Sequence, residues 1–331
     1  MPRRLILTSH ARNEDRILEW LLEPSQPAVR YRALIDLLDC KPSGTEARSA
    51  LKEIAERGWA KDILSCQYSE GIWESHSDLY YPKYTATIWR LIVLADLGLT
   101  AGNPSVKASC ELFLNGWSRS DGGFDSPGST RSELCVAGNL ARTLILCGYA
   151  DDARVRSAIR WLTENQMEDG GWHCWPHRAF GRGTLDCWEG LSAFAALPRS
   201  KWTASIKRSV ERGAEFYLRH ELFRQGKEYL PWLRFHYPVH YYYDILIGLD
   251  LMTRLGYSDD RRLEPALNIL RSKRRKEGYW LMDSIHPDLG RGAGYRMKKS
   301  VVRPFVLEEA GAPSKLITLS ALRILKHCEN Y

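Results

Sequence analysis

Gln166-Met167-Glu168-Asp169-Gly170-Gly171-Trp172 is the most complete copy of a short phrase that recurs along the chain. In each copy a glycine is followed directly, or one residue later, by a large aromatic residue. The copies lie about 50 residues apart, with a double interval before the last, and such a period is typical of repeat architectures. The other copies of this glycine-aromatic phrase are Gln67-Tyr68-Ser69-Glu70-Gly71-Ile72-Trp73, Asp121-Gly122-Gly123-Phe124 and Glu277-Gly278-Tyr279-Trp280.

The phrase has a structural reading that depends only on its residue types. Glycine gives the backbone freedom that a tight turn needs, and glutamine can bond the ends of adjacent helices. Tryptophan is large enough to pack between helix pairs. We therefore expect each copy to be a turn between two helices.

Two stretches with helical periodicity separate successive phrases, and they differ in composition. The stretch after a phrase is rich in small and apolar residues, and the next is more charged, so an inner helix alternates with an outer one. This pattern predicts an all-α fold of six antiparallel helix pairs. The first and last inner helices are both apolar enough to pack on each other, which favours closure into an (α/α)6 toroid over an open solenoid. Inner helices are expected at 27–38, 84–98, 132–148, 185–197, 240–256 and 315–327, and outer helices at 14–23, 46–66, 104–117, 151–166, 203–222 and 259–275.

The length and composition set further limits. We expect one domain over residues 1–331, with residues 1–13 as a loose N-terminal segment and 282–313 as a long loop over the cavity mouth. Hydrophobic residues make up 44% of the chain without a membrane-length apolar run, and no secretory signal is evident, so a cytoplasmic protein is predicted. The eight cysteines show no CxxC spacing and are expected to be reduced thiols. The net charge of +7 is modest, and its densest run, 271–276, fits a helix C-terminus better than a nucleic-acid site.

The spacing Gln-x3-Gly-x-Trp, present at Gln67-Gly71-Trp73 and Gln166-Gly170-Trp172, resembles the repeat of terpenoid cyclases and protein prenyltransferases. Residues 121–124 and 278–280 match the second half of that repeat, and the resemblance covers roughly residues 27–327. It implies an α/α toroid, as in squalene-hopene cyclases and in prenyltransferase and squalene oxidase repeat proteins. It also implies an apolar cavity lined by aromatic residues, and the chain has 12 Trp and 16 Tyr to line one.

In such a ring the inner helices begin on one face of the cavity, so the candidate site residues are those near the helix starts. Helix N-termini with basic residues nearby favour an anion, and the resemblance makes a diphosphate the expected one. The catalytic candidates are Asp186, His240 and Asp244. The substrate-binding candidates are Tyr80, Lys83, Tyr84, Arg131, Glu133, His236, Tyr243 and Lys315.

The segment from His236 to Asp244 contains two histidines and an aspartate at helical spacing. Pro238 predicts that the helix begins near Val239, which leaves His240 and Asp244 stacked on one face. Such a pair is either a general base or a structural hydrogen bond, and the sequence leaves both readings open.

The chain departs from both motifs that carry chemistry in the resembled family. It lacks the Asp-x-Asp-Asp motif of proton-initiated cyclases, and Lys83 and Tyr84 stand where acids are expected. Asp186 and Cys187 are adjacent, whereas prenyltransferases hold zinc with an Asp-x-Cys pair. No metal site is therefore expected, although four residues offer zinc-ligand types, and the cofactor stays unknown, with zinc and magnesium as the options. These four residues are His173, Cys174, His177 and Cys187.

Two functions follow as alternatives. The first is a protein that binds or transforms an isoprenoid or another apolar small molecule, with enzymatic activity left open. The second is a non-catalytic binding or scaffold toroid that has lost the catalytic motifs. Toroids of other chemistry, such as zinc-dependent peptide cyclases or carbohydrate-processing barrels, have motifs that the chain lacks. Neither alternative involves nucleic acid, both allow peripheral membrane contact, and a partner subunit is unknown.

Overall fold

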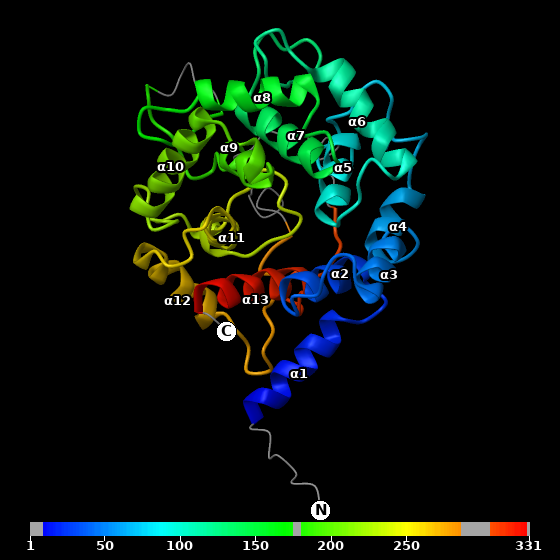
Figure 1. Cartoon of the computed structure of the whole chain (residues 1–331), viewed down its shortest axis with the longest axis vertical. Coiled ribbons are helices and arrows are strands. Elements are labelled where there is room, and N and C mark those ends of the chain that lie inside the picture. Colours follow the sequence, from blue (N-terminus) through cyan, green and yellow to red (C-terminus); the bar gives the residue numbers. More distant parts are fainter. Residues whose placement is uncertain (1–8, 175–179, 286–304, 330–331) are drawn as a thin grey trace, which may run out of the picture.

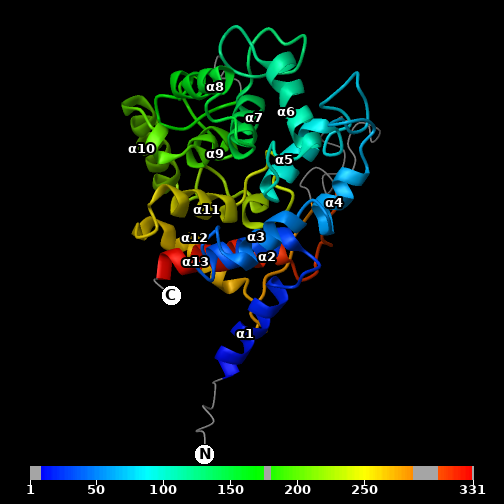
Figure 2. The ribbon, with the colours of Figure 1, turned by 45° about the vertical axis from the view of Figure 1, so that its right-hand side comes forward.

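The computed structural model describes residues 9–174, 180–285 and 305–329, and these residues contain α-helices, short 3-10 turns and no β-strand. The all-α prediction is therefore confirmed. Figure 1 shows the arrangement of the helices, and Figure 2 shows it from a second direction. The helices are α1 (Ser9–Leu21), α2 (Pro27–Asp36), α3 (Thr45–Glu53), α4 (Gly58–Ser65), α5 (Thr87–Asp96), α6 (Pro104–Trp117), α7 (Leu134–Leu146), α8 (Ala153–Glu164), α9 (Glu189–Ala196), α10 (Ala204–Arg219), α11 (Ile245–Leu255), α12 (Glu264–Ser272) and α13 (Lys315–Glu329), with 3-10 turns η2 (Arg199–Lys201), η3 (Leu230–Leu233) and η4 (Arg261–Leu263).

The helices fall into two groups that differ in burial. Helices α5, α7, α9 and α11 are buried along most of their length, whereas α6, α8, α10 and α12 expose one face. The buried helices contact one another in chain order, from α5 to α7, α9 and α11, and α11 then contacts α13. Helix α13 contacts α2, which reaches α5 through α4. In Figure 1 these helices surround the middle of the molecule, and α6, α8, α10 and α12 lie outside them.

The glycine-aromatic phrases form the turns that the sequence predicts. Gly71, Gly122, Gly170 and Gly278 all have positive φ, between 69° and 103°, a region that side-chain-bearing residues rarely occupy. Each turn also packs against the outer helix of the following pair, because a Cβ atom on the glycine would contact α6, α8, α10 and α1, respectively. The last copy therefore packs against the first helix of the described chain.

The tryptophans of three phrases repeat one hydrogen bond. The indole Nε1 of Trp73, Trp172 and Trp280 donates to the backbone carbonyl ten residues earlier, at distances of 2.7, 2.9 and 2.7 Å. All three side chains are completely buried. Each indole thus donates to a carbonyl in the last turn of the preceding outer helix, where the regular bonds between residues four apart run out. The carbonyls of Ile63 and Leu270 also accept from the backbone N–H three residues further on.

Several predicted helix bounds need correction. Helix α1 begins at Ser9, so residues 9–13 are helical rather than loose. The outer helix expected at 46–66 is two helices, α3 and α4, because the chain turns at residues 54–57 and Gly58, with a φ of 68°, is the first residue of α4 and not part of a helix interior. The inner helices expected from 84 and 240 begin later, since Tyr84 and His240 have φ values of 76° and 46°.

Three further predictions concern the long loop, the N-terminal segment and the membrane. Residues 305–313 carry no helix, and Met282 exchanges backbone hydrogen bonds with Gly311 and Ala312, but residues 286–304 of the expected loop over the cavity lie outside the described residues. Residues 1–8 also lie outside them. Among the helices of the described ranges, none is both long and apolar enough to cross a bilayer.

Candidate functional site

The candidate cavity lies between α2, α5, α7, α11 and α13 and has a volume of about 290 Å³. This volume is at the lower end of the range of about 300–1,000 Å³ that is usual for small-molecule sites. Its wall is mostly apolar, and three aromatic side chains contribute to it. The apolar and aromatic lining includes Val29, Leu97, Leu246, Ile317, Leu319, Tyr31, Trp188 and Tyr237.

Four arginines from different helices also line this cavity: Arg32 (α2), Arg142 (α7), Arg254 (α11) and Arg323 (α13). Each makes an ion pair with an aspartate. Arg142 Nη2 lies 2.6 Å from Asp96 Oδ1, and Arg254 Nε lies 2.8 Å from Asp250 Oδ2.

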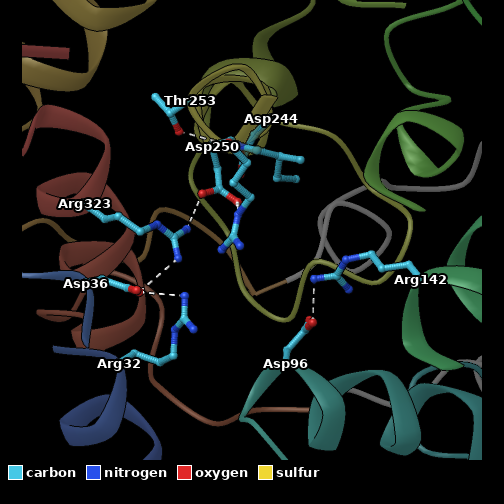
Figure 3. Close-up of polar contacts among 10 residues, drawn as sticks. Arg32, Asp36, Asp96, Arg142, Asp244, Asp250, Thr253 and Arg323 are labelled. Carbon is cyan, nitrogen blue, oxygen red and sulfur yellow. Dashed lines mark hydrogen bonds and ion pairs between the residues drawn. The ribbon is translucent and has the colours of Figure 1, made fainter. Parts of the chain in front are cut away.

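The other two arginines share Asp36, a residue of α2. Arg32 Nη2 lies 2.7 Å from Asp36 Oδ2, and Arg323 Nη1 lies 3.4 Å from the same oxygen. Arg323 also pairs with Asp250, which joins α13 to α11. Figure 3 shows Arg32 and Arg323 pointing toward Asp36, and Arg142 pointing toward Asp96. We refer to these seven side chains, from Arg32, Asp36, Asp96, Arg142, Asp250, Arg254 and Arg323, as the Arg-Asp network.

Burial and the neighbouring charges shift the pKa values of two groups in this network. Burial, followed by the nearby Arg254, lowers the pKa of Arg323 to about 10, so its guanidinium stays charged at neutral pH. Although burial opposes ionisation of Asp250, the adjacent Arg254 and Arg323 lower its pKa to about 2. The Nε atom of Arg323 has no hydrogen-bond partner within the described residues, so this buried cation keeps a spare donor.

A second cluster lies where α5 begins and brings together four of the predicted site residues. Lys83 Nζ donates to Tyr241 Oη at 2.6 Å, and the hydroxyls of Tyr84 and Tyr241 lie 2.9 Å apart. His240 stacks on Tyr84 with ring centroids 5.1 Å apart, and Tyr80 faces the Lys83 ammonium with its ring. The cavity beside Tyr80 and Tyr241 has a volume of only about 10 Å³, so the aromatic rings of this cluster fill the space between them.

The predicted stacking of His240 on Asp244 is wrong. Helix α11 begins at Ile245, and Asp244 caps it by accepting from Ile247 N–H at 3.1 Å. The partner of Asp244 is His236, whose Nδ1 lies 2.8 Å from Asp244 Oδ2, and both side chains are buried. Burial, followed by the charges of His236 and Arg90, lowers the pKa of His240 to about 3, so His240 is neutral at neutral pH.

The remaining predicted residues lie apart from one another. Asp186 is exposed and accepts from Trp232 Nε1 at 2.7 Å, and Arg131 is exposed as well. Glu133 precedes α7, and the buried Tyr243 donates to the carbonyl of Leu222. Lys315 Nζ bonds Glu23 at 2.6 Å and thus ties α13 to the segment after α1. Only His236 and Asp244 of the predicted set line the candidate cavity.

The zinc candidates come together in part. Cys174 Sγ lies 3.5 Å from Cys187 Sγ. His173, which precedes Cys174 in the sequence, is half-buried, and His177 lies outside the described residues. No three His, Cys, Asp or Glu side chains within the described ranges are arranged to hold a metal ion.

The Arg-Asp network was not predicted, although the sequence contains a signal for it. Arg32 and Asp36, and likewise Asp250 and Arg254, are charged residues four apart in inner helices that are otherwise apolar except for Arg30 and Thr253. Charged groups in buried helices are rare unless they are paired or functional, so these four positions are the sequence signal for the network.

Comparison of the chain with models of known protein families, and with curated proteins, finds no match.

Proposed function

We propose that the chain forms a closed (α/α)6 toroid of the terpenoid cyclase and prenyltransferase type, which binds a short isoprenoid with an anionic head in its central cavity. The order of helix contacts supports closure, since α13 contacts α2 and the Gly278 turn packs against Ile17 of α1. A solenoid would leave its first and last repeats without such a contact.

The observation that carries the ligand assignment is the combination of an apolar wall with the four cavity arginines. A prenyl diphosphate needs this combination, because its hydrocarbon chain gains from apolar burial and its head from charge-assisted hydrogen bonds. A guanidinium has five N–H donors, and the ion pairs of the network use only part of them. Arg142 and Arg254 therefore retain donors for a phosphate or carboxylate oxygen.

Binding without proton-initiated cyclisation fits the charge state of the cavity best. A general acid must be protonated at the working pH. Asp250 has a pKa of about 2, and Asp244 is already bonded to His236 and to the start of α11. This favours a binding or group-transfer role over proton-initiated cyclisation. A cytoplasmic location and a single domain remain part of the proposal.

Isothermal titration calorimetry with geranyl diphosphate tests this function. Titrations with geraniol, which lacks the diphosphate, and with inorganic pyrophosphate, which lacks the hydrocarbon, measure the contribution of each part of the ligand. We expect saturable binding of geranyl diphosphate, and binding at least about tenfold weaker for either part alone, since one charge-assisted hydrogen bond contributes about 1.5–3 kcal/mol.

Arg142→Met and Arg208→Met form a matched pair for the same titration. Arg142 lines the cavity, whereas Arg208 is exposed on the outer helix α10. We expect Arg142→Met to weaken binding at least about tenfold and Arg208→Met to leave it unchanged, with circular dichroism confirming that both variants are folded. Equal effects of the two variants, or no saturable binding by the wild type, would overturn the proposed function.

A further inference from the structure

His236 has a ring nitrogen for which the described part of the chain provides no partner. The side chain lines the candidate cavity and is only 1% exposed. Its Nδ1 lies 2.8 Å from Asp244 Oδ2, whereas its Nε2 has no hydrogen-bond partner among the described residues. A buried polar atom without a partner is uncommon in a folded protein, because it loses its bonds to water and gains none in return. The unused Nε2 therefore indicates a partner that enters the cavity.

Asp244 fixes the orientation of this ring. Its Oδ1 accepts from Ile247 N–H at 3.1 Å, at the start of α11, and its Oδ2 accepts from the backbone N–H of His236 at 3.2 Å. The carboxylate is thus held from two sides, and the helix N-terminus stabilises its negative charge. Because a carboxylate can only accept hydrogen bonds, the neutral ring carries its proton on Nδ1 and presents a lone pair at Nε2. His236 is therefore a hydrogen-bond acceptor that is set in place before a ligand binds.

The candidate cavity extends along α11, away from this acceptor. Its wall follows one face of the helix through residues three or four apart, namely Asp244, Ile247, Asp250 and Arg254. The step from Asp244 to Arg254 corresponds to about 15 Å along the helix axis. We refer to the two ends of the cavity as the histidine end and the arginine end.

Arg142 lies at the arginine end as well. The buried helices α5, α7, α9 and α11 run in the same direction, because one outer helix returns the chain between each of them and the next. Arg142 is in the second half of α7 and pairs with Asp96, the last residue of α5. The wall between the two ends is apolar and includes Leu246, Ile317 and Leu319. A ligand that fills the cavity therefore has an anionic head, an apolar middle and, opposite the head, a contact with His236 Nε2.

We propose that the cavity selects an isoprenoid with a hydroxyl group at the end opposite its anionic head, and that His236 Nε2 accepts a hydrogen bond from this hydroxyl. The inference rests on the proposed function, because it assigns the second end of the same ligand. A neutral donor fits the histidine end, since both oxygens of Asp244 already accept bonds and no other carboxylate of the described residues lines that end. An ammonium group would lack a counter-charge there. His236 thus determines specificity, because a ligand without the hydroxyl leaves a buried acceptor unpaired.

Calorimetric titration with two ligands tests this inference. Geranyl diphosphate and its derivative with a hydroxyl on the terminal carbon differ only at the end that faces His236. We expect the wild-type protein to bind the hydroxylated ligand at least about fivefold more tightly, which corresponds to about 1 kcal/mol. Equal affinities, or weaker binding of the hydroxylated ligand, would overturn the inference and leave the proposed function standing. Saturable binding of neither ligand would overturn both.

A third ligand and two variants assign the preference to one hydrogen bond. The corresponding terminal aldehyde can only accept hydrogen bonds, so it should bind the wild-type protein no more tightly than geranyl diphosphate does. His236→Phe keeps a flat ring without Nε2 and should bind the hydroxylated and plain ligands equally, with an unchanged circular dichroism spectrum. His327→Phe, at an exposed position of α13, should retain the full preference. A preference that the aldehyde shares, or that persists in His236→Phe, would remove His236 Nε2 from the recognition of the ligand.

Discussion

A substitution at Gly170 measures how much the contact between successive repeats contributes to the free energy of unfolding. Gly170 has a φ of 93°, and a Cβ atom there would overlap the carbonyl oxygen of Arg212 in α10. Alanine at such a φ costs about 1–2 kcal/mol from backbone conformation alone. The overlap with a backbone atom, which cannot rotate away, adds about 1–3 kcal/mol. We therefore expect Gly170→Ala to lower the free energy of unfolding by about 2–5 kcal/mol.

Gly148 provides the matched control. It lies just after α7 with a φ of 103°, and a Cβ atom there would meet no other atom within 4 Å. Gly148→Ala should therefore cost only the backbone contribution of about 1–2 kcal/mol. The difference between the two variants isolates the packing of the phrase against α10. Urea unfolding followed by circular dichroism measures it, and equal losses in the two variants would refute the claim that the phrase holds successive repeats together.

Three further predictions concern stability. Because burial places the pKa of His240 at about 3, below its ordinary 6.5, the unfolded chain binds the proton more tightly. The free energy of unfolding should be at its full value above pH 6.5 and fall by up to roughly 1.4 kcal/mol per pH unit toward pH 3. Urea unfolding at each pH measures this slope, and His240→Phe should reduce it. An unaltered slope in His240→Phe would contradict the assignment of the pH dependence to His240. Asp244→Ala removes the cap of α11 and the partner of His236 and should cost about 2–4 kcal/mol in urea unfolding, whereas Asp244→Asn should retain part of the cap. Trp280→Phe leaves the carbonyl of Leu270 without its indole donor and should cost about 1–3 kcal/mol, and a neutral result would remove that bond from the account.

The sequence predicts the local parts of this fold well. The glycine positions, the buried tryptophans and the alternation of buried and half-exposed helices all follow from residue type and periodicity, because each depends on a single turn or a single helix face. The sequence predicts helix starts less well. Tyr84 and His240 have positive φ, which is uncommon for any residue other than glycine, so the pattern does not mark them as non-helical.

The candidate site illustrates what the sequence could not predict. Arg32 and Arg323 share Asp36 although they lie almost a whole chain apart, and only the contact between α2 and α13 brings them together. Of the predicted residues at the helix starts, Tyr80, Lys83, Tyr84 and His240 do meet. Their rings fill the space between them, however, and a sequence pattern does not distinguish a packed cluster from a cavity lining.

A crystal structure of the protein with geranyl diphosphate tests the central claim most directly. The account predicts ordered density for the diphosphate within hydrogen-bond distance of Arg142 or Arg254, with the hydrocarbon chain against Leu246 and Leu319. It also predicts that α13 packs against α2 in the crystal. Density for the ligand outside this cavity, or an open arrangement in which α13 and α2 are apart, would contradict the account.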